Sequence, residues 1–434
     1  MRRWLLVAFV GLAINAQSAP NQVIHVDDNA PSGGDGSGAK PYNTIADAVT
    51  LARAVGGDPT IKVAPGRYEL ASTIRIDIPL DLVGSNVMGI DSNGWPTGVV
   101  SPGTETRIVG LAPLGVSPLV LVGRSDGAVM QNVNIRSFTF EAGPGGGSDI
   151  EIKKVQNFSV RGNILTAPFP LPKKQTTISG IMPAASSGSI IGNYIAGVGC
   201  GTCITAGNSG SPASVEFTGN RSVHNLNGGV LLNGSSLGVP DQGDQLDAVV
   251  QGNDLSQNTD GNSFGVRIYV IRRDLPDTQS SGNVHALIRG NRIFGNHIGI
   301  SIDAGFPYRQ VGFPKPSDPT LVCDTRVYTG TLDVTLTDNT LSGSSLTAGL
   351  ISFTRYTATL DPSQLPSWQY LHNATYIIND PQGSLAGYLK DHPINNPSFP
   401  PPSYSGILIC AADTTNEPLG NTLVYNGVIV PATQ

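Results

Sequence analysis

The residues best suited to chemistry lie on a short strand pattern that repeats in the second half of the sequence. A glycine followed by apolar, variable and apolar residues recurs at Gly180, Gly229, Gly265, Gly299 and Gly349. Side chains in a strand alternate between two faces, so aligned copies of this pattern present their variable positions on one outer surface. These outward positions are Leu231, Asn233, Arg267, Tyr269, Ser301, Asp303, Ile351 and Phe353.

This outward surface has the chemistry of a site for an extended sugar chain. Aromatic faces stack on sugar rings, and arginine pairs with uronate carboxylates. In a lyase reaction, a base removes the proton beside a uronate carboxylate that a cation neutralises. We therefore treat Arg267, Asp303 and Arg272 as candidate catalytic residues, although an arginine base needs help because of its high pKa. The alternative is that Arg267 and Asp303 form an ordinary surface ion pair, which contributes little to stability.

Three long polar segments follow these strands, at residues 234–247, 271–283 and 304–331. Such loops would leave the same edge of successive repeats and form a wall beside the outward surface, where function is usually placed on a rigid scaffold. We add Tyr308 and Arg309 from the third loop to Asn233 and Tyr269 as candidate substrate-binding residues. Carboxylates in the first loop could bind calcium or form a solvated acidic surface. They are Asp241, Asp244 and Asp247.

Two further chemistries receive less support. The segment Asn258-Thr-Asp-Gly261 resembles one motif of the polygalacturonases, in which that aspartate is catalytic. Their other motifs, an Asp-Asp pair, Gly-His-Gly and Arg-Ile-Lys, are absent, and Asn-Thr-Asp-Gly is also ordinary turn chemistry. The 6 histidines show no metal-ligand spacing and no partner motif for a nucleophile, so we expect no catalytic histidine.

A second repeat defines the scaffold that positions these residues. Six segments share an apolar entry, a Gly-Asn or Asp-Asn step and an apolar exit, with their asparagines at positions 163, 193, 220, 253, 291 and 339. Gly or Asp tolerates the positive φ of a sharp corner, and equivalent asparagines can hydrogen-bond along a stack. The asparagines are therefore predicted to be structural. The intervals between them widen to 38 and 48 residues, which places insertions in the later repeats.

The opening of the chain resembles the pectin-lyase-like β-helix superfamily. The resemblance lies in Ile24-His-Val-Asp-Asp, in Lys40-Pro-Tyr-Asn-Thr-Ile-Ala-Asp-Ala and in Ile61-Lys-Val-Ala-Pro-Gly-Arg-Tyr. It implies an all-β, right-handed parallel β-helix in which a short helix covers the first coil. Residues 44–55 have the apolar spacing of that helix, with Thr44 as N-cap. The resemblance is specific for fold and carries little information about activity.

The remaining organisation follows from composition and targeting signals. Residues 1–19 are typical of a signal peptide, because two arginines precede a short apolar run and then small residues. We expect the β-helix over residues 20–354 and a C-terminal cap over residues 355–434, closed by strands at 406–410, 422–425 and 427–430. The protein is thus predicted to be secreted, with no transmembrane segment. The four cysteines allow three disulfide pairings, of which we favour Cys200–Cys203 and Cys323–Cys410.

The charge of the chain limits the classes of molecule that it can bind. The net charge is −6 and no long basic run is present, which disfavours nucleic acid. Two classes of function remain. The first is a protein that binds or processes a polysaccharide, most plausibly as a lyase on a uronate-containing glycan. The second is a non-catalytic extracellular scaffold that binds a surface glycan or a protein.

Overall fold

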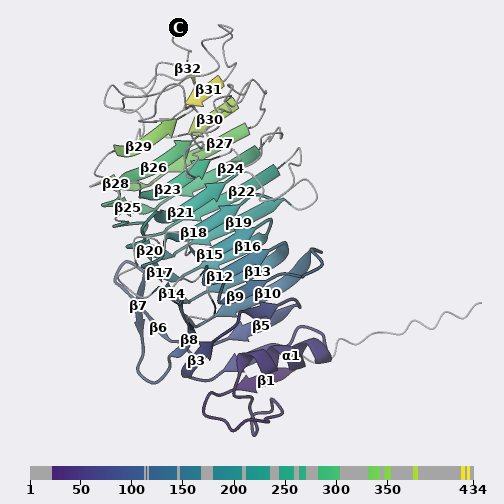
Figure 1. The fold of residues 1–434 in the computed structure, drawn as a ribbon. Helices are drawn as coiled ribbons and strands as arrows, with labels where there is room; N and C mark the ends of the chain where they lie inside the picture. Colours follow the sequence, from purple (N-terminus) through teal and green to yellow (C-terminus); the bar gives the residue numbers. More distant parts are fainter. Residues whose placement is uncertain are drawn as a thin grey trace, which may run out of the picture.

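The structure is a computed structural model, in which the chain winds into a stack of coils made of three long sheets (Figure 1). It describes residues 22–111, 114, 117–143, 147–167, 179–207, 212–234, 244–258, 263–269, 282–303, 331–342, 347–352, 375–379, 422–425 and 428–430. Within these ranges, neighbouring strands of the long sheets pair in parallel, apart from the terminal pair β31 (Thr422–Tyr425) and β32 (Val428–Val430). The right-handed parallel β-helix predicted from the sequence is confirmed.

Most coils add one strand to a thirteen-strand sheet and one to a nine-strand sheet, whereas the strands of a six-strand sheet come from the earlier coils. The thirteen-strand sheet comprises β1 (Val23–Val26), β2 (Thr60–Val63), β5 (Leu80–Val83), β10 (Met130–Arg136), β13 (Val155–Arg161), β16 (Ser187–Ile191), β19 (Ala213–Thr218), β22 (Asp244–Gln251), β24 (Gly282–Arg289), β27 (Thr331–Thr337), β30 (Thr375–Asn379), β31 and β32. The six-strand sheet comprises β3 (Gly66–Leu70), β8 (Thr106–Gly110), β11 (Thr139–Glu141), β14 (Ile164–Thr166), β17 (Tyr194–Ala196) and β20 (Arg221–Val223).

The nine-strand sheet completes the coil. It comprises β4 (Ile74–Ile76), β9 (Val120–Val122), β12 (Ile150–Lys153), β15 (Ser179–Ala184), β18 (Cys200–Thr205), β21 (Gly228–Asn233), β23 (Phe264–Tyr269), β26 (Ile298–Asp303) and β29 (Thr347–Ser352). Two short pairs stand apart from the long sheets, β25 (Arg292–Phe294) with β28 (Thr340–Ser342), and the antiparallel hairpin β6 (Met88–Ile90) with β7 (Pro96–Val100).

The Gly-Asn step forms the corner between the thirteen-strand and six-strand sheets. The glycines of this corner have φ between 61° and 63°, and Asp338 reaches 57° at the equivalent place. The asparagines that follow are buried or half-buried and form the predicted ladder, in which each Oδ1 from Asn193 onwards accepts hydrogen bonds from the asparagine one coil earlier. For example, the backbone and side-chain amides of Asn193 donate to Asn220 Oδ1, both at 2.9 Å. The structural role predicted for these asparagines is confirmed.

A second asparagine ladder, which the sequence pattern did not reveal, forms the corner between the six-strand and nine-strand sheets. The backbone amide of Asn225 donates to Asn258 Oδ1 at 3.0 Å, and the side chain of Asn258 donates to Asn296 Oδ1 at 2.8 Å. All three are buried. Asn258 of the polygalacturonase-like segment is therefore a structural corner residue, while Asp260 of that segment lies outside the described residues.

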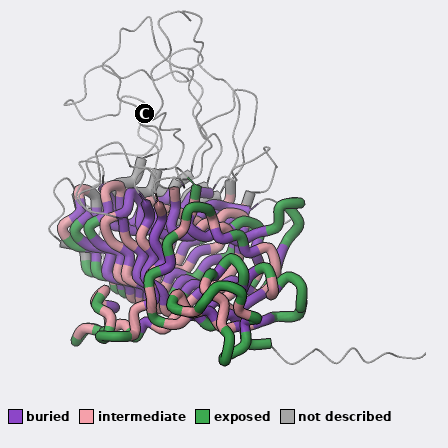
Figure 2. The backbone as a smooth tube through the Cα atoms, turned by 60° about the horizontal axis from the view of Figure 1, so that its bottom comes forward, coloured by how far each residue is buried: buried purple, intermediate pink, exposed green. Residues whose placement is uncertain are grey.

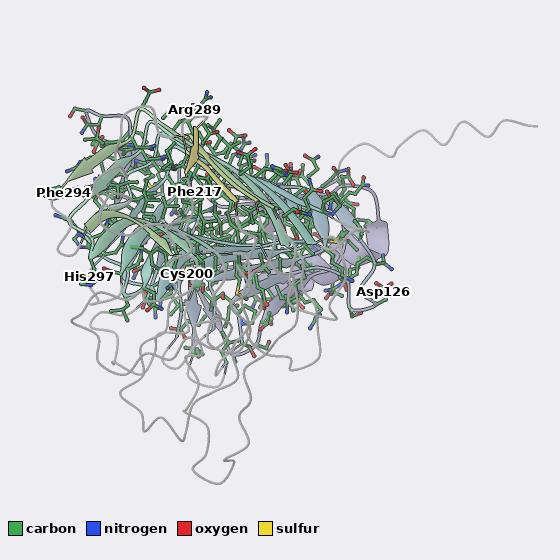
Figure 3. All side chains as sticks on the ribbon, turned by 90° about the horizontal axis from the view of Figure 1, so that it is seen from above. Asp126, Cys200, Phe217, Arg289, Phe294 and His297 are labelled. Atoms are coloured by element: carbon green, nitrogen blue, oxygen red, sulfur yellow. A yellow bond between two sulfur atoms is a disulfide. The ribbon has the colours of Figure 1, made fainter. Side chains whose placement is uncertain are left out.

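The interior of the coils is a continuous apolar core. Figure 2 shows buried backbone in successive coils of the described stack. In many strands of the thirteen-strand sheet, residues alternate between this core and the outside. In β19, Ala213, Val215 and Phe217 are buried whereas Ser214 and Glu216 are exposed. Phe217 points into the centre of the coil (Figure 3). Alternation of this kind leaves one polar outer position for every second residue of each strand.

Both ends of the stack show features predicted from the sequence. Helix α1 (Ile45–Val55) lies against β1, β2 and β4, and buries Ile45, Ala48, Val49 and Ala52. Its N-cap Thr44 accepts a hydrogen bond from the Asp47 amide at 3.1 Å. A covering helix of this type shields the apolar interior and free strand edge of the first coil. At the other end, β31 and β32 match two of the three predicted closing strands, and 406–410 lies outside the described residues.

The hairpin β6–β7 leaves the second coil and runs along the outside of the six-strand sheet (Figure 1). Its Trp95 donates a hydrogen bond through Nε1 to the carbonyl of Gly252 at 3.0 Å. The ring of Tyr194 packs so closely on Gly98 that a Cβ there would lie 2.7 Å from it. The hairpin therefore connects an early coil to coils much later in the sequence.

Candidate functional site

An open groove of about 720 Å³ crosses the outer face of the thirteen-strand sheet. It extends over six neighbouring strands, from β13 through β16, β19, β22 and β24 to β27. At one end, Ser187, Ser189 and Ser214 line it with small hydroxyl side chains. At the other end, its lining includes larger polar side chains beside Val249 and Leu287.

A histidine between two aspartates forms the most polar part of the groove. Strand pairing aligns Asp247 with His285 and His285 with Asp333, in three successive coils. The Nδ1 atom of His285 lies 3.7 Å from Oδ2 of Asp333, and both side chains are exposed to solvent. Asp247 also accepts a hydrogen bond from the side chain of Gln245 at 2.9 Å. Imidazole and carboxylate side chains at this spacing can exchange protons with a ligand and hold its polar groups.

Small residues and one irregularity in pairing create the groove. Between β13 and β16 the register shifts around Asn157, which has a φ of 59° and adds one residue to its strand. Gly188 of β16 lies against Phe158, and a Cβ at this glycine would lie 2.2 Å from the Phe158 carbonyl oxygen. Gly188 aligns with Val215 of the inward-facing row, so the low outer surface at this point comes from the small outward residues Ser187, Ser189 and Ser214. Strands β22, β24 and β27 carry larger outward residues.

The outward surface predicted around Arg267 lies on a different sheet. Strands β21, β23 and β26 are neighbours, and their register aligns Leu231 with Arg267 and Ser301. The row two residues further along these strands aligns Asn233 with Tyr269 and Asp303. Arg267 is half-buried and its guanidinium lies 5.8 Å from the centre of the Phe264 ring, whereas Asn233 is buried. These candidate residues thus share one face of the nine-strand sheet.

The last strand of that surface differs from the prediction. Ser301 pairs with Leu350 and Asp303 pairs with Ser352, so Ile351 occupies a position aligned with Ile302 of the inward-facing row. The prediction placed Ile351 and Phe353 outward and is wrong by one residue at Ile351, because Ala348 rather than Gly349 aligns with the earlier glycines. Phe353 lies outside the described residues, as do Arg272, Tyr308 and Arg309.

The aspartates predicted to bind calcium do not share a loop. Asp244 begins β22 and Asp247 lies within it, so the loop predicted over 234–247 ends before Asp244. Asp247 faces the groove of the thirteen-strand sheet, away from Arg267, because β22 belongs to that sheet. Asp241 lies outside the described residues. Across the part of the chain that the structure describes, no three His, Cys, Asp or Glu side chains gather as a metal site would require.

The groove residues Glu216, His285 and Asp333 were not predicted from the sequence. Each occupies an outward position of its strand, within the runs Val215-Glu-Phe217, Val284-His-Ala286 and Leu332-Asp-Val334. The signal was present as an alternation of apolar and polar residues. The alignment of His285 with two aspartates was hidden because 37 and 47 residues separate it from them in the sequence.

A second polar cluster lies where the hairpin meets the later coils. Oδ2 of the buried Asp254 lies 3.3 Å from Arg221 Nε and 3.3 Å from Arg292 Nη1. The guanidinium of Arg292 also lies 5.9 Å from the centre of the Trp95 ring. The two arginines are thus held by a carboxylate and an indole ring, so this cluster connects the hairpin to the coils.

The carboxyl group of Asp149 is fully buried beside the start of β12. Neither oxygen has a hydrogen-bond partner within the described residues. Burial raises the pKa of Asp149 well above its ordinary value, and the nearby charge of Glu141 acts in the same direction. A protonated carboxyl group at this position is a local cost to stability, and it lies on a different sheet from the groove.

The predicted Cys200–Cys203 disulfide is present and lies in β18 of the nine-strand sheet (Figure 3). Cys323 and Cys410, the other predicted pair, lie outside the described residues. Among the residues that the structure describes, there is no helix with the length and hydrophobicity needed to cross a membrane.

Several solved structures resemble this chain in fold. A protein titled Geobacillus virus E2 ORF18 is 15% identical with a TM-score of 0.40, and the match covers 76% of this chain and 59% of the viral protein. The pectate lyase Pel9A is 12% identical with a TM-score of 0.29, covering 83% of this chain and 76% of the lyase.

A third structure is the catalytic domain of a GH87 α-1,3-glucanase crystallised with tetrasaccharides. It is 14% identical with a TM-score of 0.39, and the match covers 84% of this chain and 65% of that domain. The chain thus spans less than two thirds of the viral protein and of the glucanase domain. At these identities the likenesses concern the fold alone.

Sequence comparison identifies the family. No curated protein matches the sequence. The sequence profile of one family matches residues 29–306, which is more than half of the chain and includes the coils from α1 to β26. The parallel coils of this chain agree with the pectin-lyase-like fold predicted from the opening of the sequence. The chain therefore belongs to the family described as "Protein of unknown function (DUF1565)".

Proposed function

We propose that this protein is an exported β-helix that binds a polysaccharide lengthwise across its coils, in the groove of the thirteen-strand sheet. The observation that carries the proposal is the groove itself, which crosses six strands and repeats polar outward positions from coil to coil. Adjacent strands lie about 4.8 Å apart, so a polymer laid across them meets similar side chains at regular intervals. Hydroxyl, amide and carboxylate groups at such intervals suit the hydroxyl groups of a sugar chain.

The apolar side chains in the groove support the same function. Val249 and Leu287 are half-buried neighbours in one outward row, between Glu216 and Thr335. Binding sites for small or extended ligands combine an apolar surface with a few polar groups that set orientation. A sugar ring has an apolar face and a polar edge, so one row can contact its face while His285 and the aspartates contact its edge.

A variant that fills the groove tests this proposal. Ser214 is exposed on its floor, and Ser214→Trp places a large side chain across the path of the polymer. Binding to insoluble and soluble polysaccharides would be measured for both proteins by co-sedimentation and calorimetry. The matched control is Ser72→Trp, which adds the same side chain at an exposed position outside the groove. Loss of binding in Ser214→Trp alone supports the proposal, and unchanged binding in Ser214→Trp would refute it.

A lyase on a uronate-containing glycan is the second candidate function, and the register of the nine-strand sheet favours it. Asn233, Tyr269 and Asp303 align in one row of this sheet, two residues along the strands from the row of Arg267. A glycan bound across these strands would meet both rows. Arg267, Asp303 and Arg272 remain its proposed catalytic residues, with Asn233, Tyr269, Tyr308 and Arg309 in contact with substrate.

The lyase reaction leaves unsaturated sugar ends that absorb in the ultraviolet. The protein would be incubated with uronate polymers with and without calcium, and the absorbance compared with that of Arg267→Ala. Product formation by the native chain that is lost in the variant supports a lyase at this face. Absence of product, together with polysaccharide binding in the groove, favours the non-catalytic function.

A further inference from the structure

The charges of the groove indicate which class of polysaccharide it accepts. We propose that the groove binds a sugar polymer that carries protonated amino groups, such as a chain of free glucosamine units. This inference rests on the proposed function and specifies the ligand of that site. It differs from the uronate glycan expected of the nine-strand face, because the two faces carry different charged side chains.

The charge of the lining comes from acidic side chains. Glu216, Asp247 and Asp333 line the groove together with His285, and none of its described lining residues is a lysine or an arginine. The three carboxylates lie on β19, β22 and β27, so they occupy three different coils. Glu216 is exposed, and Asp333 is 38% exposed, so both can reach a bound polymer.

The existing partners of these carboxylates leave acceptor capacity for a ligand. Glu216 accepts a hydrogen bond from the Thr218 hydroxyl at 3.0 Å, and Asp247 accepts one from Gln245 at 2.9 Å. Each is a neutral donor, and an ionised carboxylate has about four acceptor sites. An ammonium group supplies three donors and a positive charge, which makes it a stronger partner than a sugar hydroxyl.

The spacing of the carboxylates matches a polymer better than a single ion. Asp247 and Asp333 share one row with His285 between them, so their backbones are two strand spacings, or roughly 9.6 Å, apart. Glu216 aligns with Val249, which follows Asp247 by two residues on the neighbouring strand. Charges on both sides of the apolar Val249 and Leu287 favour a chain with amino groups along its length.

An anionic polymer is disfavoured for the same reason. A uronate carboxylate in this groove would approach Glu216, Asp247 and Asp333 without an opposing lysine or arginine in the described lining. Like charges near a protein surface repel each other, and the repulsion is strongest at low ionic strength. A neutral sugar polymer avoids this repulsion but gains no ion pair.

Two oligomers that share one sugar backbone and differ in charge distinguish a cationic ligand from a neutral one. Binding of a glucosamine oligomer would be compared by calorimetry with binding of the N-acetylglucosamine oligomer of the same length, in low and high salt. We expect the free amine form to bind about tenfold more tightly at low salt, and this preference to shrink as salt screens the charges. An oligogalacturonate serves as the anionic comparison and is expected to bind most weakly.

Variants assign the preference to the groove. Glu216→Gln, Asp247→Asn and Asp333→Asn should each weaken binding of the glucosamine oligomer by about threefold, with little effect on the acetylated oligomer. The matched control is Glu69→Gln on β3 of the six-strand sheet, an exposed carboxylate far from the groove, which should leave both affinities unchanged. Circular dichroism of each variant shows whether it is folded.

The outcomes test the preference for amino groups separately from the binding of polysaccharide in general. Equal binding of both glucosamine-type oligomers, or tightest binding of oligogalacturonate, would overturn the charge preference while leaving polysaccharide binding intact. Failure of every oligomer and polymer to bind would overturn the proposed function as well. A preference for the amine form that survives all three groove variants would show that the site binding the amino groups lies elsewhere on the molecule.

Discussion

Trp95 and Gly252 are 157 residues apart in sequence, yet the indole Nε1 of Trp95 donates a hydrogen bond of 3.0 Å to the Gly252 carbonyl. Arg292, from a still later coil, stacks on the same ring at 5.9 Å and lies 3.3 Å from the buried carboxylate of Asp254. In a stack of coils each coil contacts mainly its neighbours, so stability is largely a sum of local terms. The hairpin adds a connection across several coils.

Trp95→Ala is therefore expected to destabilise the protein by roughly 2 kcal/mol, through loss of a hydrogen bond and of the contact with Arg292. Trp95→Phe keeps an aromatic ring but removes the donor, and should cost about 1 kcal/mol. Urea denaturation, followed by the far-ultraviolet circular dichroism of the backbone, measures the unfolding free energy of both variants. Equal stability of the native chain and Trp95→Ala would show that the hairpin does not brace the coils.

The asparagine ladder predicts a large effect from a single amide. Asn220 Oδ1 accepts two hydrogen bonds from Asn193, while its Nδ2 donates to the Ile190 carbonyl and to Asn253. Asn220→Ala removes these four hydrogen bonds and leaves the buried backbone amide of Asn193 without this acceptor, which should cost roughly 2–4 kcal/mol. Asn93→Ala, at an exposed turn, should change the unfolding free energy by less than about 0.5 kcal/mol. Similar denaturation midpoints for the two variants would contradict this role of the ladder.

The corner glycine tests the backbone contribution separately. Gly219 has a φ of 63°, and a Cβ built there meets no atom within 4 Å. Gly219→Ala should therefore cost roughly 1 kcal/mol from backbone strain alone. Gly219→Asn should cost less, because asparagine and aspartate tolerate positive φ and Asp338 adopts a φ of 57° at the equivalent corner. Thermal and urea unfolding of the two variants give the comparison.

Asp149 predicts a pH dependence of stability. Burial raises its pKa in the folded state above the value of an unfolded chain. The folded state then holds the proton more tightly, so the stabilisation is complete below the unfolded pKa and is lost as pH rises through the folded pKa. Asp149→Asn removes this loss because its side chain does not ionise. The unfolding free energy of the variant minus that of the native chain should therefore be larger at neutral pH than at acidic pH. Urea unfolding of both proteins across that range measures the difference.

The control for Asp149 is Asp126, a carboxyl group whose pKa is shifted in the opposite direction. Hydrogen bonding from Arg124 lowers the pKa of Asp126 to about 2. Its contribution is present above the unfolded pKa and is lost as pH falls through the folded pKa, so Asp126→Asn should matter least in strong acid. Parallel pH profiles for the two variants would contradict both assignments.

Much of the architecture was predictable because its determinants are local. A glycine or aspartate before Asn193, Asn220 or Asn339 sets a corner through its own φ, and the apolar residues around it enter the same core in every coil. Helix α1 is encoded by the spacing of its apolar residues and by Thr44. The Cys200–Cys203 disulfide joins residues only 3 positions apart. Each of these features depends on a few neighbouring residues.

The candidate site depends on register between coils, which the sequence alone left open. His285 lies between Asp247 and Asp333 only because pairing of β22, β24 and β27 continues across intervening segments of unequal length. Asp247, which was expected in a loop beside the Arg267 surface, therefore faces a groove on another sheet. Likewise, no local pattern indicates that Trp95 reaches Gly252. The sequence repeats determined the corners, the core positions and the asparagine ladder. Tertiary pairing decided which outward side chains meet across coils, because strand register is a property of the whole sheet.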